Sequence, residues 1–251
     1  WELYRVSDDF REANNLVEKE PVKLRELQDL FWVEAARYNV LPLDNSKVER
    51  LDTANRPSLT RGRSVFSYYP GQVRIPEGAA PDVKNKSFQI VASVEIPTGG
   101  AEGMLMTQGG RFAGWGLYLL GGKPVFCYNL AGVDRYIVTG KDKLTPGKHT
   151  IAMDFKSDGP GLGKGGTATI TVDDKPTAEG KIARTLPFRM SLDETLDCGE
   201  DTGTPVSEAY HVPFRFSGTI AKVVVKLGNA KLTPEEQREY DEIRGRGVMA
   251  E

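Results

Sequence analysis

The feature that most constrains the fold is a long series of short apolar segments that begins near residue 88 and ends near residue 227. Each segment alternates apolar and polar residues or forms a short apolar run, and β-branched and aromatic residues are frequent. Clusters of Gly and Pro separate the segments, and no long helical pattern interrupts them. The pattern predicts nine strands, over residues 88–96, 103–107, 115–120, 125–130, 136–138, 150–155, 167–172, 188–192 and 219–227.

Closely spaced strands without intervening helices must be joined by hairpins or Greek-key crossings, which excludes a parallel α/β sheet. We therefore expect a mainly β protein. An antiparallel jelly-roll sandwich of the concanavalin A-like kind over residues 63–228 fits the pattern best. The 251 residues suffice for one such core with an appendage.

The first forty-five residues differ in kind, because Leu, Glu, Lys, Arg and Ala dominate and glycine is rare. Pro21 suits the first turn of a helix, and the pattern predicts a helix over residues 21–38. One apolar stripe follows the helical spacing and needs a partner surface, so we expect self-association through Leu24, Leu27 and Phe31. The stripe consists of Leu24, Leu27, Phe31, Ala35 and Tyr38.

Two further segments complete the organisation. Residues 46–62 lack periodicity and are interpreted as a connector between residues 1–45 and the sandwich. Residues 229–251 are expected to form a helical tail, in which Thr233 can cap a helix over residues 233–243.

Charge and hydropathy exclude two classes of partner. The formal net charge is −2 and the isoelectric point is about 5.9, so a nucleic acid or an anionic membrane surface is not expected to bind. No apolar run approaches the roughly twenty residues that span a bilayer. The two cysteines, Cys127 and Cys198, leave open whether they pair and which redox compartment holds the protein.

An acidic stretch from residue 193 to residue 201 contains five carboxylates. Oxygen-rich loops of this kind suit Ca²⁺, and the candidate ligands are Asp193, Asp197, Glu200 and Asp201. Asp193 and Asp197 would also share a face of an extended strand, as the acid and nucleophile of a glycosidase do. A solvated loop that packs against a neighbouring domain is the third interpretation.

Aromatic residues in the predicted strands suggest a different function, the binding of a carbohydrate. The candidate contacts are Trp115, Tyr118 and Tyr128, with Arg111 available to pair with a sulfate group. Trp115 and Tyr118 have opposite parity along one strand, so at most one of them faces solvent. Packing in the core is the competing interpretation for each ring.

Signatures of other catalytic classes are weak. No Gly-x-Ser-x-Gly string is present, and both histidines, His149 and His211, are expected to cap or pack. The glycine-rich stretch 159–167 carries Gly165 where a phosphate-binding loop needs Ser or Thr after its lysine, so it is interpreted as a hairpin loop.

Long ordered strings nevertheless resemble one family. WELYRVSDDFREANNLVEKEPVKLRELQDLFWVEAARYNVLPLDN, at residues 1–45, resembles the segment that closes the catalytic domain of sulfatases. The rest of the chain resembles the concanavalin-like jelly roll that follows this domain in long bacterial arylsulfatases. The strings that carry this second resemblance are GGAEGMLMTQGGRFAGWGLYLL, VFCYNL, LTPGKHTIAMDF, TVDDKP and SLDETLDCGEDTGTPV.

The resemblance implies an active site upstream of Trp1. Sulfatases use a divalent cation and a formylglycine made from the first residue of a Cys/Ser-x-Pro-x-Arg motif, which this sequence lacks. The residues that follow Cys127 and Cys198 do not match this motif. The string from Thr185 to Arg189 has its Pro and Arg at the right spacing, but it begins with Thr, which is not converted to formylglycine.

We therefore expect an accessory region without activity of its own and with no cofactor beyond the calcium considered above. Its expected partner is the upstream catalytic domain of an enzyme that hydrolyses a sulfated glycan or an aryl sulfate. The resemblance also implies a periplasmic or secreted location. A carbohydrate-binding module is the alternative function.

Overall fold

The computed structural model describes residues 1–43, 45, 59–191, 193–228 and 235 of the chain. The chain divides into two compact units, Trp1–Arg50 and Leu51–Glu251. The helix expected over residues 233–243 and most of the connector lie outside the described residues. Within the described part, no helix is long and apolar enough to cross a membrane.

The first unit contains helix α1 (Pro21–Arg37), which begins at the proline that the sequence indicated. An irregular segment, residues 1–20, packs against one side of the helix, with the rings of Trp1 and Phe31 5.3 Å apart. The predicted apolar stripe is thus partly covered within its own unit, although Leu27 remains exposed. Leu3 and Ala35 are the buried apolar residues among the described residues of this unit.

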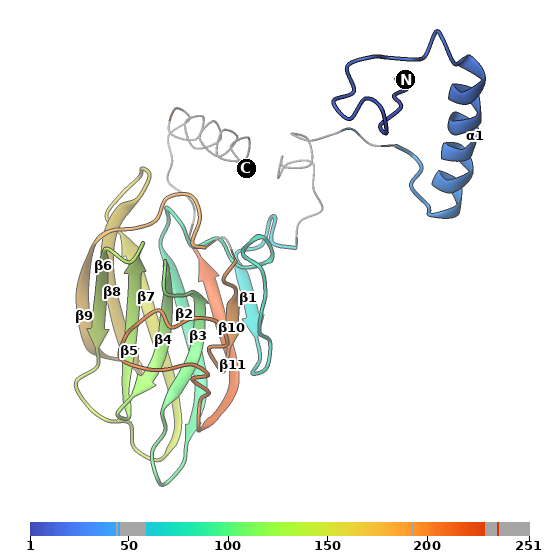
Figure 1. Ribbon diagram of the computed structural model, residues 1–251. Coiled ribbons are helices and arrows are strands. Elements are labelled where there is room, and N and C mark those ends of the chain that lie inside the picture. The colour runs from blue at the N-terminus through green and yellow to red at the C-terminus, as the bar shows by residue number, and fades with distance from the viewer. Residues whose placement is uncertain (44, 46–58, 192, 229–234, 236–251) are drawn as a thin grey trace. The chain divides into compact units, whose positions relative to one another are not determined.

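The second unit is a β-sandwich of two antiparallel sheets (Figure 1). This confirms the mainly β, jelly-roll class. Sheet A has the order β1 (Val65–Tyr68), β11 (Thr219–Leu227), β2 (Phe88–Ile96), β7 (Gly147–Ser157), β8 (Lys164–Val172) and β9 (Lys175–Arg184). Sheet B has the order β10 (Leu196–Cys198), β3 (Gly103–Gly109), β4 (Gly114–Leu120), β5 (Lys123–Leu130) and β6 (Asp134–Thr139), and a short 3₁₀ helix, η1 (Glu77–Ala79), precedes β2.

Eight of the nine predicted strands are present, and the prediction over residues 188–192 is wrong. There the described residues are irregular, and buried Met190 fills the core from a loop. Strands β1, β9 and β10 were not predicted. All three are edge strands. Strand β9 has a single buried residue, Ile182, so it lacks the apolar alternation that identifies a strand.

The main core lies between the two sheets. In β2 every second residue is buried, from Phe88 to Ile96, while the residues between them are more exposed. These side chains meet Leu117 and Phe126 of sheet B in one continuous apolar cluster. Period-two alternation therefore has its usual cause, one buried face and one solvated face.

Strands β3, β4 and β5 of sheet B depart from this rule because both of their faces are covered. An irregular segment, residues 199–216, lies over their outer face and is called the cover segment below. Glycines allow the close approach, since a Cβ at Gly103 would lie 2.2 Å from the carbonyl oxygen of Arg215. All seven residues of β3 are consequently buried. The second apolar cluster consists of Met104, Tyr118, Val125, Cys127, Val206 and Tyr210.

A buried ion-pair network lies in the segment that leads into β2. The Lys84 amine lies 2.6 Å from Glu77 and 2.8 Å from Asp82. Glu77 also accepts hydrogen bonds from the backbone N–H groups of Met190 and Ser191. Burial alone would lower the pKa of Lys84, but the two carboxylates raise it, so the amine stays charged. The network joins two chain segments that are more than one hundred residues apart.

We predict that Lys84→Ala destabilises the protein by about 3–5 kcal/mol, because it leaves Glu77 partly buried without its cation. Lys181→Ala is the matched control, since Lys181 and its partner Asp158 are largely exposed and such a pair contributes about 0–1 kcal/mol. Urea midpoints of the two variants measure the difference. Equal midpoints would show that the buried network adds nothing to stability.

Candidate functional site

The three aromatic residues predicted to contact a glycan are buried, so that prediction was wrong. Trp115 and Tyr128 point into the main core, and Tyr118 points to the opposite face of sheet B. The parity argument for Trp115 and Tyr118 thus holds. Tyr118 is hidden because Tyr210 and Phe214 of the cover segment pack on it, with ring centroids 5.3 and 6.1 Å away.

The structure does not bring the four candidate calcium ligands together in one group. Asp193 is exposed and lies outside β10, whereas Asp197 and Asp201 are buried and Glu200 lies on the rim of a hollow of about 460 Å³. Among the described residues no three His, Cys, Asp or Glu side chains are placed to hold a metal ion. Asp193 and Asp197 also do not pair as a glycosidase requires, because one is exposed and the other is buried.

The protein's own donors occupy three of these carboxylates, those of Asp197, Glu200 and Asp201. Asp197 accepts hydrogen bonds from the backbone N–H of Arg74 at 2.6 Å and from the N–H and hydroxyl of Thr202 at 2.8 and 2.6 Å. Glu200 accepts from Nε and Nη2 of Arg215 at 3.2 and 2.9 Å. Asp197 of β10 therefore fastens the start of the cover segment, and Glu200 joins the two ends of that segment to each other.

Asp201 is the most deeply placed of the four, with 1% of its surface exposed. It accepts hydrogen bonds from the hydroxyl of Tyr210 at 2.5 Å and from the N–H of Gly203 at 3.3 Å. Burial raises the pKa of Asp201 to about 6, and the charges of Asp197 and Glu194 act in the same direction, while the two hydrogen bonds oppose it.

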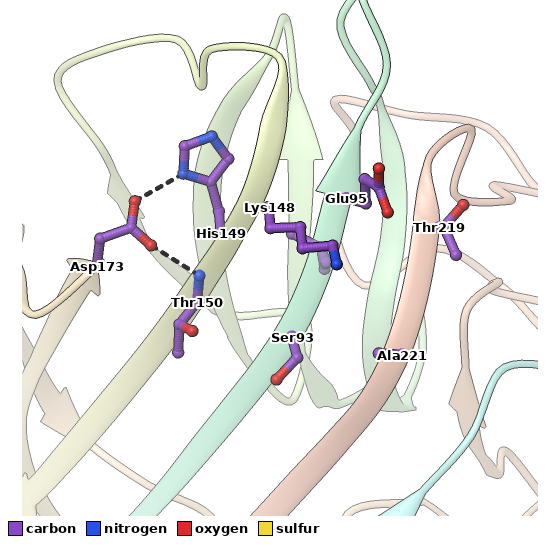
Figure 2. Close-up of a pocket in the computed structure, with 9 residues that line it drawn as sticks. Ser93, Glu95, Lys148, His149, Thr150, Asp173, Thr219 and Ala221 are labelled. Atoms are coloured by element: carbon purple, nitrogen blue, oxygen red, sulfur yellow. Dashed lines mark hydrogen bonds and ion pairs between the residues drawn. The ribbon is translucent and has the colours of Figure 1, made fainter.

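A hollow of about 350 Å³ lies at the ends of β2, β7 and β11, with His149 and Asp173 at its edge (Figure 2). His149 Nδ1 lies 2.7 Å from Asp173, and its Nε2 lies 2.8 Å from the carbonyl oxygen of Thr145. Both oxygens are acceptors, so this geometry favours the imidazolium form, in which both ring nitrogens donate.

The pKa of His149 agrees with that protonation state. Burial alone would lower it, but the bonds to Asp173 and Thr145 outweigh burial and raise it. The hydrogen bond from the backbone N–H of Thr150 is the largest cause that lowers the pKa of Asp173 below its usual range, and the interaction with His149 lowers it further. With no free nitrogen, His149 cannot serve as a general base. It ties β7 to the β8–β9 turn, as expected of a packing residue.

The cysteines offer no nucleophile. Cys127 and Cys198 are free thiols, and each is buried. Burial raises the pKa of each thiol to about 12, so neither forms a thiolate near neutral pH.

One predicted contact, Arg111, is exposed, and it lies in the turn between β3 and β4. The next residue, Phe112, is 70% exposed. The sequence pattern does not indicate Phe112 as a site residue, because exposure of a single apolar residue in a turn leaves no periodic signal. Its position between Gly110 and Gly114 was the available indication, since glycines on both sides favour a tight turn that projects its tip.

Comparisons with known proteins give limited information. No family model and no curated protein matches the chain. The CBM40 of Ruminococcus gnavus IT-sialidase, bound to α2,3-sialyllactose, is similar over 73% of this chain and 97% of that chain, with 15% identity and a TM-score of 0.47. Domains LG4–5 of the mouse laminin α1 chain are similar over 67% of this chain and 40% of that chain, with 18% identity and a TM-score of 0.39. At this level of similarity neither protein supports an argument about ligand or activity.

We predict that Asp201 makes the protein less stable as pH rises from about 4 to about 6. A carboxyl with a raised pKa binds its proton more tightly in the folded state, so its contribution is present below about pH 4 and is lost as pH rises through about 6. Asp201→Asn removes this loss, which amounts to roughly 3 kcal/mol at most. Urea denaturation of both proteins at pH 4, 5, 6 and 7 tests this, because the difference between them isolates Asp201 from the other acids. A difference independent of pH would contradict the prediction.

Proposed function

We propose that the chain is a non-catalytic accessory region of a larger hydrolase of the sulfatase type. In this proposal residues 1–45 complete another folded domain, and the sandwich is an appended module. One observation carries the proposal: the first unit leaves most of its large apolar side chains exposed. They are Trp1, Val6, Phe10, Val22, Leu27, Leu30, Trp32, Val33, Tyr38, Val40, Leu41 and Leu43.

Such exposure is unfavourable for an independent unit. Burying one large apolar side chain contributes about 1.5–3 kcal/mol, and a segment of this length rarely builds its own core. Helix α1 is apolar on two sides, because Phe31 faces residue Trp1 while Val22, Leu30 and Val33 share a second, exposed side. A helix that is apolar on two sides is typical of the interior of a larger domain.

Chemistry supports the absence of catalysis in this region. His149 has acceptors at both ring nitrogens, the cysteines are buried thiols, and protein donors engage Asp197, Glu200 and Asp201. The sulfatase identity of the larger enzyme rests on the strings at residues 1–45 and in the sandwich that resemble that family. The reaction proposed for that enzyme is hydrolysis of a sulfate ester to an alcohol or phenol and sulfate.

We predict that the chain alone does not hydrolyse 4-nitrophenyl sulfate. A longer natural chain that includes an upstream Cys/Ser-x-Pro-x-Arg segment, co-expressed with the formylglycine-generating enzyme, is expected to hydrolyse it, because that segment supplies the nucleophile. Release of 4-nitrophenol from both proteins measures the difference. Turnover by this chain alone would overturn the proposal, as would an inactive longer chain whose formylglycine is confirmed by mass spectrometry.

We also predict that Leu30→Ser with Val33→Ser destabilises the longer chain by several kcal/mol, because both side chains become buried there. In this chain, where both are exposed, the same pair should change stability by less than about 0.5 kcal/mol. Arg25→Ser with Asp29→Ser, two exposed polar residues of the same helix, is the matched control. Equal effects of the apolar pair in the two proteins would show that α1 docks on nothing upstream.

A second candidate function is carbohydrate binding by the sandwich. Exposed Arg111 and exposed Phe112 favour it, because a guanidinium beside an aromatic ring can contact the hydroxyl or anionic groups and the C–H face of a sugar. The two candidates are compatible, since an accessory module can hold the substrate of the enzyme that carries it.

A further inference from the structure

Hydrogen bonds from a buried side chain hold the backbone of the turn that carries Arg111 and Phe112. The side-chain amide of buried Asn129 donates to the carbonyl oxygens of Gly110 and Arg111 at 2.8 and 2.9 Å. Its own oxygen accepts the N–H of Gly132, at 3.0 Å, from the turn between β5 and β6. Asn129 thereby fixes two neighbouring turns at one end of sheet B with one side chain.

A second set of bonds fixes the turn from the other side. Thr204 Oγ1 accepts the backbone N–H of Arg111 at 2.7 Å and donates to Glu194 at 2.5 Å. Glu194 also accepts the Thr204 N–H at 3.2 Å. Four chain segments therefore meet in one polar network. A loop positioned in this way loses little conformational entropy when it binds a ligand.

The side chains above this network are free. Phe112 is 70% exposed and Val133, in the neighbouring turn, is 76% exposed. The guanidinium of Arg111 makes no hydrogen bond or ion pair with any residue that the structure describes. A rigid backbone thus presents an aromatic ring, an aliphatic side chain and an unpaired cation to solvent.

Other surfaces of the sandwich are less suited to a sugar. The cover segment hides the outer face of β3, β4 and β5, and the exposed residue on that side of β6 is the aliphatic Ile137. On the outer side of sheet A the exposed residues of β2 and β7 are polar, such as Glu95 and Lys148. Among the described residues of the sandwich, Phe112 and Tyr69 are the exposed residues of the Phe, Tyr and Trp types.

We propose that Arg111, Phe112 and Val133 bind a sulfated glycan, with the C–H face of a pyranose on Phe112 and Val133 and the sulfate on Arg111. This inference rests on the second candidate function and names its site and ligand class. The patch suits a sugar ring, because two apolar side chains are far fewer than the 20–30 residues that each partner contributes to a protein interface. The planar guanidinium matches the oxygens of a sulfate as it does those of a phosphate.

The test uses the whole chain on an array that carries chondroitin, heparan and galactan sulfates, each beside its desulfated form. The wild-type protein is expected to bind at least one sulfated member and to prefer it to the desulfated form. Phe112→Ala should weaken binding roughly tenfold. Arg111→Gln should bring the sulfated and desulfated forms to equal affinity. Tyr69→Ala, which removes the other exposed ring, is the matched control and should bind as the wild type does.

Two failures are distinguishable. If the wild-type protein binds no member of the array, carbohydrate binding itself is overturned. If the wild type binds while Phe112→Ala binds equally well, or if Tyr69→Ala causes the loss, the function survives and this site is overturned. A sulfate preference that persists in Arg111→Gln overturns the role of Arg111. Unchanged thermal unfolding of each variant confirms that the folded state is intact.

Discussion

Burial of both faces of strands β3, β4 and β5 is the constraint on which the rest of the sandwich depends. Sheet A closes one face, and the cover segment closes the other with Val206, Tyr210 and Phe214. The cover segment has no strand or helix of its own, and backbone hydrogen bonds to Met104 and Leu105 of β3 hold its two ends. Asp197 adds side-chain bonds to Thr202 at its start, and Asp201 bonds to Tyr210 within it. An acidic stretch that suggested a cation site in the sequence is thus a fastening between chain segments.

The strands could be predicted from the sequence wherever one face is buried. Strand β2 alternates from Phe88 to Ile96 because every second residue faces the core, and its predicted bounds were correct. Strand β9 could not be found, because half of its residues are polar and its pairing with β8 rests on backbone hydrogen bonds. The prediction of a strand over residues 188–192 was wrong for the opposite reason, since Met190 is buried without belonging to a strand. The pattern of apolar residues in the sequence indicates which residues are buried. A buried residue can belong to a loop as well as to a strand, so the pattern alone does not identify a strand.

The candidate site was less accessible to prediction for a related reason. Parity correctly placed Trp115 and Tyr118 on opposite faces of one strand, but parity cannot show whether another segment covers a face. Tyr118 is covered by residues about ninety positions later in the chain. The carboxylates of Asp197 and Asp201 likewise find donors through contacts that no local spacing encodes. Arg111 is exposed, as a glycan contact must be, because a charged residue in a turn stays exposed whatever packs beside the sheet, and its contact with a glycan stays a prediction.

The two units have opposite kinds of surface, and this difference bears on the division of labour within the proposed enzyme. Exposed apolar side chains on the first unit are favourable only where another surface removes them from water. The sandwich already buries its apolar faces, one between the sheets and one under the cover segment, so its stability needs no partner. A self-sufficient module is free to place a small apolar patch such as Phe112 and Val133 on a rigid turn, because the fold does not depend on burying it. In the proposed enzyme, the exposed apolar residues of the first unit contact the rest of the enzyme, and the turn with Phe112 contacts the ligand. Because the two roles belong to different residues, each can be tested separately.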